Sequence, residues 1–118
     1  MTDPWKDLIV WQKAHNLVIE IYKLTRSFPE DEKYGLIQQV RRSAVSVSAN
    51  IVEGKSRKTK KEFSFFLHNS RGSLEETRYH ILLARDLEYI TDQQYQAIEE
   101  LSVGVSYLLN QLINSLPK

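Results

Sequence analysis

Residues 41–55 of the chain read RRSAVSVSANIVEGK, and this stretch decides the fold. Counted at about 100° per residue, it predicts a helix with two apolar stripes. The first stripe, which starts upstream of the stretch, comprises Ile37, Val40, Ala44, Val47 and Ile51. The second comprises Val45, Ala49 and Val52. Valine is a mediocre helix former, so a strand is the rival interpretation. No apolar–polar alternation spans the stretch, and the helical period fits better.

Two apolar stripes predict burial from two directions. A surface helix of a monomer needs one stripe, so we expect bundle partners on one side and another subunit on the other. Gly54 fits the residue just past a helix, where a positive φ is favoured, so the helix is predicted to end near Glu53. Lys55, Arg57 and Lys58 would then suit the negative end of the helix dipole.

The composition predicts one all-α domain, residues 1–118. Four glycines, three prolines and 26% charged residues are typical of long helices rather than of a turn-rich β fold. Cysteine is absent, which excludes a disulfide frame, a thiolate metal site and a cysteine nucleophile. A secretory signal pattern and an apolar run of membrane-spanning length are lacking, so we expect a cytoplasmic protein.

The first helix is predicted from about Leu8 and ends before Phe28-Pro29, because a residue that precedes proline is biased away from the α region. Its core stripe comprises Leu8, Trp11, Ala14, Val18, Ile21, Tyr22 and Thr25, widened by Val10, Leu17 and Leu24. The acidic residues 30–32 then precede the second helix, where negative charge suits the dipole.

The third helix carries a heptad seam of the kind found in antiparallel bundles. The seam comprises Phe63, Leu67, Ser70, Leu74, Thr77, Ile81 and Ala84. Capping boxes at residues 59–62 (TKKE) and 91–94 (TDQQ) begin the third and fourth helices. The stripe of the fourth helix comprises Ile98, Leu101, Ser102, Val105, Leu108, Leu109, Leu112, Ile113 and Leu116. Short connections make sequential helices antiparallel neighbours, so the sequence predicts an up-down-up-down four-helix bundle.

Small polar residues on the second and third helices predict a structural network between them. The second helix contributes Ser43, Ser46, Asn50 and Glu53, and the third contributes Ser70, Ser73 and Thr77. We expect these side chains to pair, because a buried unpaired hydroxyl costs about 1–3 kcal/mol. Arg71 or Arg78 is the expected partner of Asn50 and Glu53. A separate stripe on the third helix is a second candidate subunit interface and comprises Phe65, Tyr79, Leu83 and Leu87.

Charge is unevenly distributed, although the formal net charge is only +1. Residues 41–61 hold seven basic residues and one acid, a net +6, which leaves −5 for the remainder. The candidate nucleic-acid-binding residues are Arg41, Arg42, Lys55, Arg57, Lys58, Lys60 and Lys61. In an oligomer they would repeat as a ring that attracts phosphates; the alternative is a solvated loop with charged helix ends. No aromatic residue lies between Lys55 and Lys61, so no stacking platform is predicted there.

No residue pattern predicts catalysis, a metal or a cofactor. A nucleophile–base pair is missing, and so is a glycine-rich phosphate loop. His68 and His80 project about 120° apart on one helix and cannot chelate one ion, while Glu76 and His80 form no Glu-x-x-His motif. We therefore expect a protein that is not an enzyme.

The chain resembles the four-helix bundle family of proteins encoded within intervening sequences of bacterial 23S ribosomal RNA genes. The most specific part is residues 39–54, QVRRSAVSVSANIVEG. Supporting segments are residues 7–14 (DLIVWQKA), 28–29 (FP), 32–36 (EKYGL), 62–63 (EF) and 72–76 (GSLEE). They cover most of the first three helices, whereas the fourth matches in pattern alone.

The resemblance implies a four-helix bundle, a homopentamer and no established enzymatic activity. It also implies a relation to accessory proteins of diversity-generating retroelements, which bind nucleic acid and a reverse transcriptase through a basic surface. The near-zero net charge of this chain departs from those strongly basic relatives. The expected partners are copies of the chain and RNA or a nucleic-acid-processing protein, without a membrane. A purely structural or protein-interaction bundle is the alternative.

Overall fold

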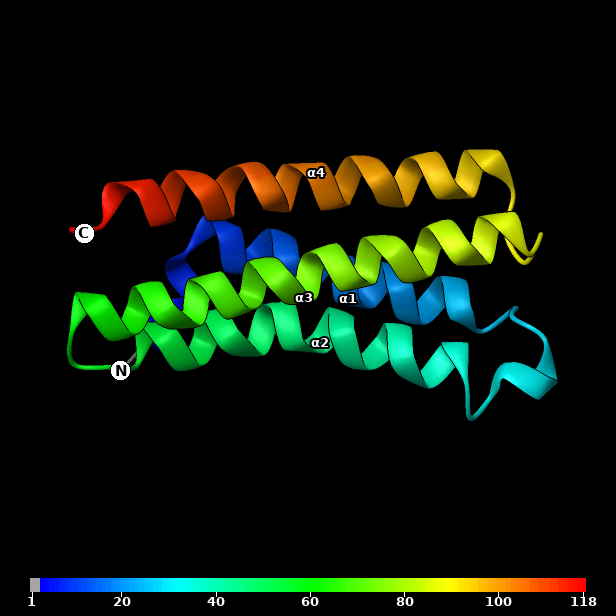
Figure 1. Cartoon of the computed structure of the whole chain (residues 1–118), viewed down its shortest axis with the longest axis horizontal. Coiled ribbons are helices and arrows are strands. Elements are labelled where there is room, and N and C mark those ends of the chain that lie inside the picture. Colours follow the sequence, from blue (N-terminus) through cyan, green and yellow to red (C-terminus); the bar gives the residue numbers. More distant parts are fainter. Residues whose placement is uncertain (1–2) are drawn as a thin grey trace.

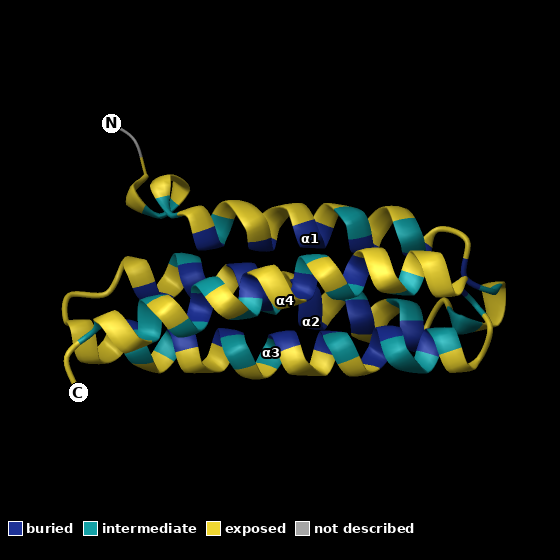
Figure 2. Cartoon of the chain, turned by 90° about the horizontal axis from the view of Figure 1, so that it is seen from above, coloured by how far each residue is buried: buried dark blue, intermediate teal, exposed yellow. Residues whose placement is uncertain are grey.

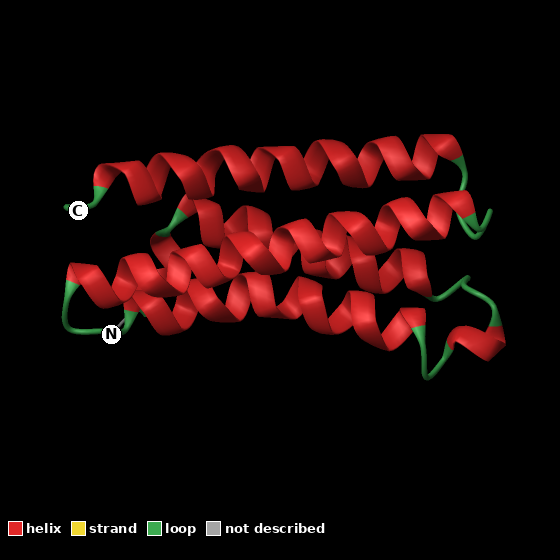
Figure 3. Ribbon diagram, in the orientation of Figure 1, coloured by secondary structure: helices red, strands yellow, loops and turns green. Residues whose placement is uncertain are grey.

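The computed structural model describes residues 3–118. Within this range four helices run alternately up and down, as Figure 1 shows: α1 (Ile9–Thr25), α2 (Leu36–Lys55), α3 (Lys60–Asp86) and α4 (Asp92–Ser115). The short 3-10 helices η1 (Pro4–Asp7) and η2 (Glu30–Glu32) precede α1 and α2, and short loops make the remaining connections (Figure 3). The α2–α3 turn and the C-terminus lie at one end of the bundle, and η2 lies at the other. The predicted four-helix bundle is confirmed.

The α3 helix runs the length of the molecule. Its 27 residues span about 40 Å at 1.5 Å per residue, close to the 43 Å long axis of the chain. Every residue of the predicted heptad seam is buried, so the seam is confirmed. The most extensive helix contact is that of α3 with α2, and α1 and α4 complete the ring. Figure 2 shows buried and exposed positions recurring along each helix, as an amphipathic pattern requires.

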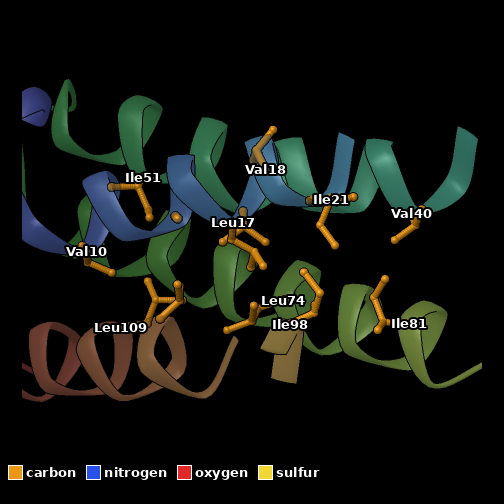
Figure 4. Close-up of a cluster of buried hydrophobic side chains, with 14 of the residues drawn as sticks. Val10, Leu17, Val18, Ile21, Val40, Ile51, Leu74, Ile81, Ile98 and Leu109 are labelled. Carbon is orange, nitrogen blue, oxygen red and sulfur yellow. The ribbon is translucent and has the colours of Figure 1, made fainter. Parts of the chain in front are cut away.

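Aliphatic side chains from all four helices meet along the axis of the bundle. Figure 4 shows Val10, Leu17, Val18 and Ile21 of α1, Val40 and Ile51 of α2, Leu74 and Ile81 of α3, and Ile98 and Leu109 of α4. Burial of one such side chain contributes about 1.5–3 kcal/mol, so this core holds the helices together. Among residues 3–118, no helix combines the length and the apolar character needed to cross a membrane.

The buried face of α1 is rotated from the predicted stripe. Val10 and Leu17 are buried, whereas Trp11 is half-buried and Tyr22 is exposed. The Trp11 ring instead packs against Trp5, with ring centroids 4.8 Å apart. Apolar residues surround so much of α1 that the period alone does not decide which stripe meets the other helices.

The prediction that Gly54 lies past the end of α2 is wrong. The helix continues to Lys55, Gly54 is buried, and no glycine in the described chain has a positive φ. A Cβ atom at Gly54 would lie 2.8 Å from Phe66 Cβ and 3.0 Å from Phe63 Cδ1. The missing side chain therefore serves the close approach of α2 and α3 near their turn.

The two predicted capping boxes have different outcomes. At α4, Thr91 Oγ1 accepts the Gln94 N–H at 3.0 Å and Gln94 Oε1 accepts the Thr91 N–H at 2.9 Å, so this box is confirmed. At α3, Thr59 Oγ1 accepts the Glu62 N–H at 3.1 Å, but the Glu62 carboxylate accepts the Thr59 hydroxyl. The second hydrogen bond of this box, from the Thr59 backbone N–H to the Glu62 side chain, was predicted wrongly, because the Glu62 carboxylate accepts from the Thr59 hydroxyl instead.

Candidate functional site

A seam of small polar side chains joins α2 to α3. The hydroxyl oxygens of Ser46 and Ser73 lie 2.9 Å apart, and those of Ser43 and Thr77 lie 2.8 Å apart. Ser70 donates to the Val47 carbonyl oxygen at 2.7 Å. Because small side chains let the helix backbones approach, the hydroxyls reach across directly, and they satisfy one another's hydrogen bonds within the contact between the two helices.

One of the residues expected in this network belongs to it, and another lies apart. Asn50 donates to the carbonyl oxygen of Ser46, one turn back on its own helix, and to the Ser46 hydroxyl, which also bonds to Ser73. Glu53 is exposed and pairs with Arg57 at 2.6 Å. The expected arginine partners are also wrong: Arg71 donates to Asn110 and Arg78 pairs with Glu75 and Glu99 on α3 and α4. The α4 acceptors lie far away in sequence, and pattern reasoning did not find them.

His80 is a buried member of the seam that the sequence did not reveal. Its Nδ1 atom lies 3.4 Å from Ser43 Oγ. Burial lowers the pKa of His80 below its ordinary value, and the nearby Glu76 carboxylate partly opposes this shift. Ser43 and His80 are both buried, so this hydroxyl–imidazole pair lies within the contact between α2 and α3. Among residues 3–118, no group of three or more His, Asp or Glu side chains could hold a metal ion.

The seven candidate nucleic-acid-binding residues do not form one patch. Arg41 and Arg42 lie in the second turn of α2, whereas Lys55 and the four others lie at the α2–α3 turn. Lys55 lies 13 positions after Arg42 on the same helix, which corresponds to about 20 Å at 1.5 Å per residue. The seven basic residues are close in sequence, which suggested one cluster. Because most of α2 lies between the two groups, they form two separate sites.

The cationic end, as we name Lys55, Arg57, Lys58, Lys60 and Lys61, surrounds the α2–α3 turn. The Lys55 ammonium lies 5.6 Å from the centre of the Phe63 ring, and the Arg57 guanidinium lies 4.8 Å from that of Phe66. Within the described chain, Arg57 alone of the five has a carboxylate partner. All of the group except Lys61 line a hollow of about 260 Å³, together with Thr59 and the residues Leu8, Gly54, Phe63, Leu112 and Leu116.

A second cationic site, which we name the tyrosine hollow, lies where α1, α2 and the connection after η2 meet. It has a volume of about 470 Å³ and is lined by Tyr22, Lys33, Tyr34, Ile37, Gln38, Arg41 and Arg42. Arg41 is fixed within it: Nε donates to Thr25 Oγ1 at 2.9 Å, and the guanidinium carbon lies 4.5 Å from the Tyr22 ring centre. The sequence places these residues in three segments, so no local motif predicts the hollow.

Glu32 holds the turn that carries Tyr34. Its Oε1 atom accepts the Leu36 N–H at 3.1 Å, and its Oε2 atom accepts the Tyr89 hydroxyl at 2.7 Å. Both hydrogen bonds, with that of Tyr89 the stronger cause, lower the pKa of Glu32. At Gly35 a Cβ atom would lie 2.7 Å from Glu32 Oε1, so glycine leaves space for the carboxylate. Of the acidic residues predicted to precede α2, Glu32 is the one whose carboxylate accepts a backbone N–H of the first turn of the helix.

Two apolar stripes remain uncovered by the chain itself. On α2, Val45 is 40% exposed and Ala49 is exposed, while Val52 is half-buried. On α3, Phe65 and Tyr79 are 61% and 59% exposed and Leu83 is half-buried, and Leu87, the residue that follows α3, is exposed. Exposed aromatic and aliphatic side chains gathered on helix faces are typical of protein interfaces.

Comparison with known proteins relates the chain to one family. The family model described as 23S rRNA-intervening sequence protein matches residues 6–111. A crystal structure of a protein with unknown function from the S23 ribosomal protein family of Bacteroides thetaiotaomicron is similar at 28% sequence identity and a TM-score of 0.81, covering 91% of this chain and 100% of that one. No curated protein matches the chain. Neither description names a reaction.

Proposed function

Because the chain belongs to the 23S rRNA-intervening sequence protein family, we propose that it is a non-enzymatic, self-associating scaffold that binds RNA through its cationic end. The observation that carries the RNA part is the set of lysines there that form no ion pair with a carboxylate of residues 3–118. Lys58, Lys60 and Lys61 are exposed beside the first turn of α3. Unpaired ammonium groups can neutralise phosphates, which releases counterions and favours binding. We place this activity in the cytoplasm.

A salt titration of RNA binding tests this part. The variant Lys58→Gln/Lys60→Gln/Lys61→Gln should bind duplex RNA more weakly at low salt, and its plot of log affinity against log salt should be shallower by up to roughly 2. The matched control is Lys6→Gln/Lys13→Gln/Lys23→Gln, which removes the same charge at η1 and α1. Equal losses in the two triple variants, or no binding by the unsubstituted protein at low salt, would refute an RNA-binding cationic end.

Self-association is supported by the uncovered stripes on α2 and α3. Light scattering coupled to size exclusion should give a mass that is a multiple of 13.8 kDa, and five copies is the number that we propose. Val45→Glu and Phe65→Glu should each lower this mass, because a carboxylate buried in an apolar interface is strongly disfavoured. Val103→Glu on α4, where valine is 49% exposed, is the control. A folded species of 13.8 kDa at every concentration would refute self-association.

A protein-interaction bundle without RNA is the second candidate function. It is favoured by the net charge of only +1 and by the ion pair that occupies Arg57. On this alternative the lysines serve solubility, and a protein partner captured with the chain would remain bound after nuclease treatment. Release of the partner by nuclease would favour the RNA-binding function instead.

A further inference from the structure

We propose that the tyrosine hollow binds an unpaired nucleotide of an RNA strand, with the base stacked on Tyr34 and the phosphate held by Arg41, Arg42 and Lys33. The inference rests on the proposed function in that RNA is the partner. It adds a second contact at the opposite end of α2 from the cationic end, and it assigns that contact to single strands.

Tyr34 has the exposure and the fixed position that a stacking platform needs. Its side chain is 79% exposed, the highest value among the exposed large apolar side chains of the described chain. Its backbone lies in the turn that follows Glu32. The Glu32 carboxylate restrains this turn by accepting hydrogen bonds from the Leu36 N–H and the Tyr89 hydroxyl. A large aromatic ring presented to solvent from a restrained turn can accept a base at low entropic cost.

The cations around Tyr34 are free for a phosphate. Arg41 uses Nε and Nη2 to contact Thr25 and Tyr22, which orients the guanidinium and leaves Nη1 without a partner in residues 3–118. Arg42 is exposed, and the Lys33 ammonium lies 5.6 Å from the Tyr34 ring centre. Within the described chain, no carboxylate forms an ion pair with these three residues. A fixed guanidinium with free N–H groups is well suited to phosphate.

The geometry favours an unpaired nucleotide over a duplex. Bases in a helix are stacked on their neighbours and cannot turn a face to a protein ring, whereas unpaired bases stack readily on tyrosine and on arginine planes. Tyr22, with Arg41 over its ring, supplies such a plane beside Tyr34. A volume of about 470 Å³ falls within the range typical of small-ligand sites, about 300–1,000 Å³. Glu32, two residues before Tyr34 in the sequence, uses its two carboxylate oxygens to accept hydrogen bonds from the Leu36 N–H and the Tyr89 hydroxyl.

Fluorescence anisotropy with one labelled, unstructured RNA strand and with the same strand annealed to its complement tests the inference. Tyr34→Ala should weaken single-strand binding about tenfold, from stacking of 1–3 kcal/mol per base, and leave duplex binding unchanged. Tyr34→Phe should retain both affinities because it retains the ring. Tyr107→Ala is the matched control, since Tyr107 is 64% exposed on α4 and lines neither cationic hollow. The mass of each variant is measured by light scattering.

The outcomes separate this inference from the proposed function. Unchanged single-strand affinity in Tyr34→Ala, with duplex binding that depends on Lys58, Lys60 and Lys61, overturns the inference alone. Loss of single-strand binding in Tyr34→Ala, with no effect of the lysines on either RNA, supports the inference and overturns the role of the cationic end. A lower mass together with equal loss of both RNAs assigns Tyr34 to a contact between copies and overturns the inference. Absence of RNA binding overturns both.

Discussion

Replacing Gly54 with alanine should destabilise the bundle, although the same change in an open helix position is stabilising. Alanine is favoured over glycine in a helix interior by about 1 kcal/mol. At Gly54 the new Cβ atom would lie 2.8 Å from Phe66 Cβ, 3.0 Å from Phe63 Cδ1 and 3.3 Å from the Phe63 carbonyl oxygen. Normal carbon–carbon contacts lie at about 3.5–4.0 Å, so α2 and α3 must separate.

The net effect follows from these two opposed terms. Overpacking a well-packed contact costs about 1–3 kcal/mol, and the upper part of this range applies because Phe66 Cβ and the Phe63 carbonyl cannot rotate away. After subtraction of the helical preference, Gly54→Ala should lose about 1–2 kcal/mol of unfolding free energy. Gly72 and Gly104 lie within α3 and α4, and a methyl group added at either would meet no neighbouring atom within 4 Å. Gly72→Ala and Gly104→Ala should therefore gain about 0.5–1 kcal/mol.

Urea unfolding followed by far-UV circular dichroism measures these differences. With a slope of about 2 kcal/mol per molar urea, the midpoints of Gly54→Ala and of the two control variants should differ by about 1 M. Protein concentration must be held constant, because self-association would raise the apparent stability of all of them. A Gly54→Ala protein whose midpoint rises as much as those of the controls would refute the close approach of α2 and α3 at this residue.

Three further changes test other parts of the structure. Ser48→Ala should raise the urea midpoint by about 0.5 M, because the buried Ser48 Oγ has no partner in the described chain and its removal is worth about 1 kcal/mol; a lower midpoint would contradict this. Thr91→Ala should cost about 1 kcal/mol through loss of the α4 cap, seen in the same titration, and an unchanged midpoint would show that the cap is redundant. Burial lowers the pKa of His80, so the unfolded chain takes up this proton first as the pH falls. The stability that neutral His80 provides should be complete above about pH 6.5 and decline below it. Urea midpoints measured across this pH range should fall less steeply in His80→Gln, and parallel curves would contradict the assignment.

The sequence by itself determined the number and direction of the helices and the internal face of α3. The spacing that places Phe63, Leu67 and Ile81 on one face of α3 is local, because helix geometry alone decides which positions share a face. The Thr91–Gln94 box is local for the same reason, since both partners lie within one turn. Ser46 and Ser73 were expected to meet because small side chains on neighbouring antiparallel helices leave the backbones close enough for hydroxyls to bond.

Only the tertiary structure decided which of several suitable faces was used and which distant residues became neighbours. Helix α1 carries apolar residues on more than one side. Its packing against α2 and α4, rather than its own period, decided which of these sides is buried. Glycine at position 54 suits both the end of a helix and the close approach of a neighbour, and the position of Phe66 decided between these roles. Tyr34 and Arg41 form one hollow because the turn at Glu32 folds back onto α2 and is held by Tyr89, 57 residues away. Such contacts depend on the arrangement of whole helices, which no short stretch of sequence encodes.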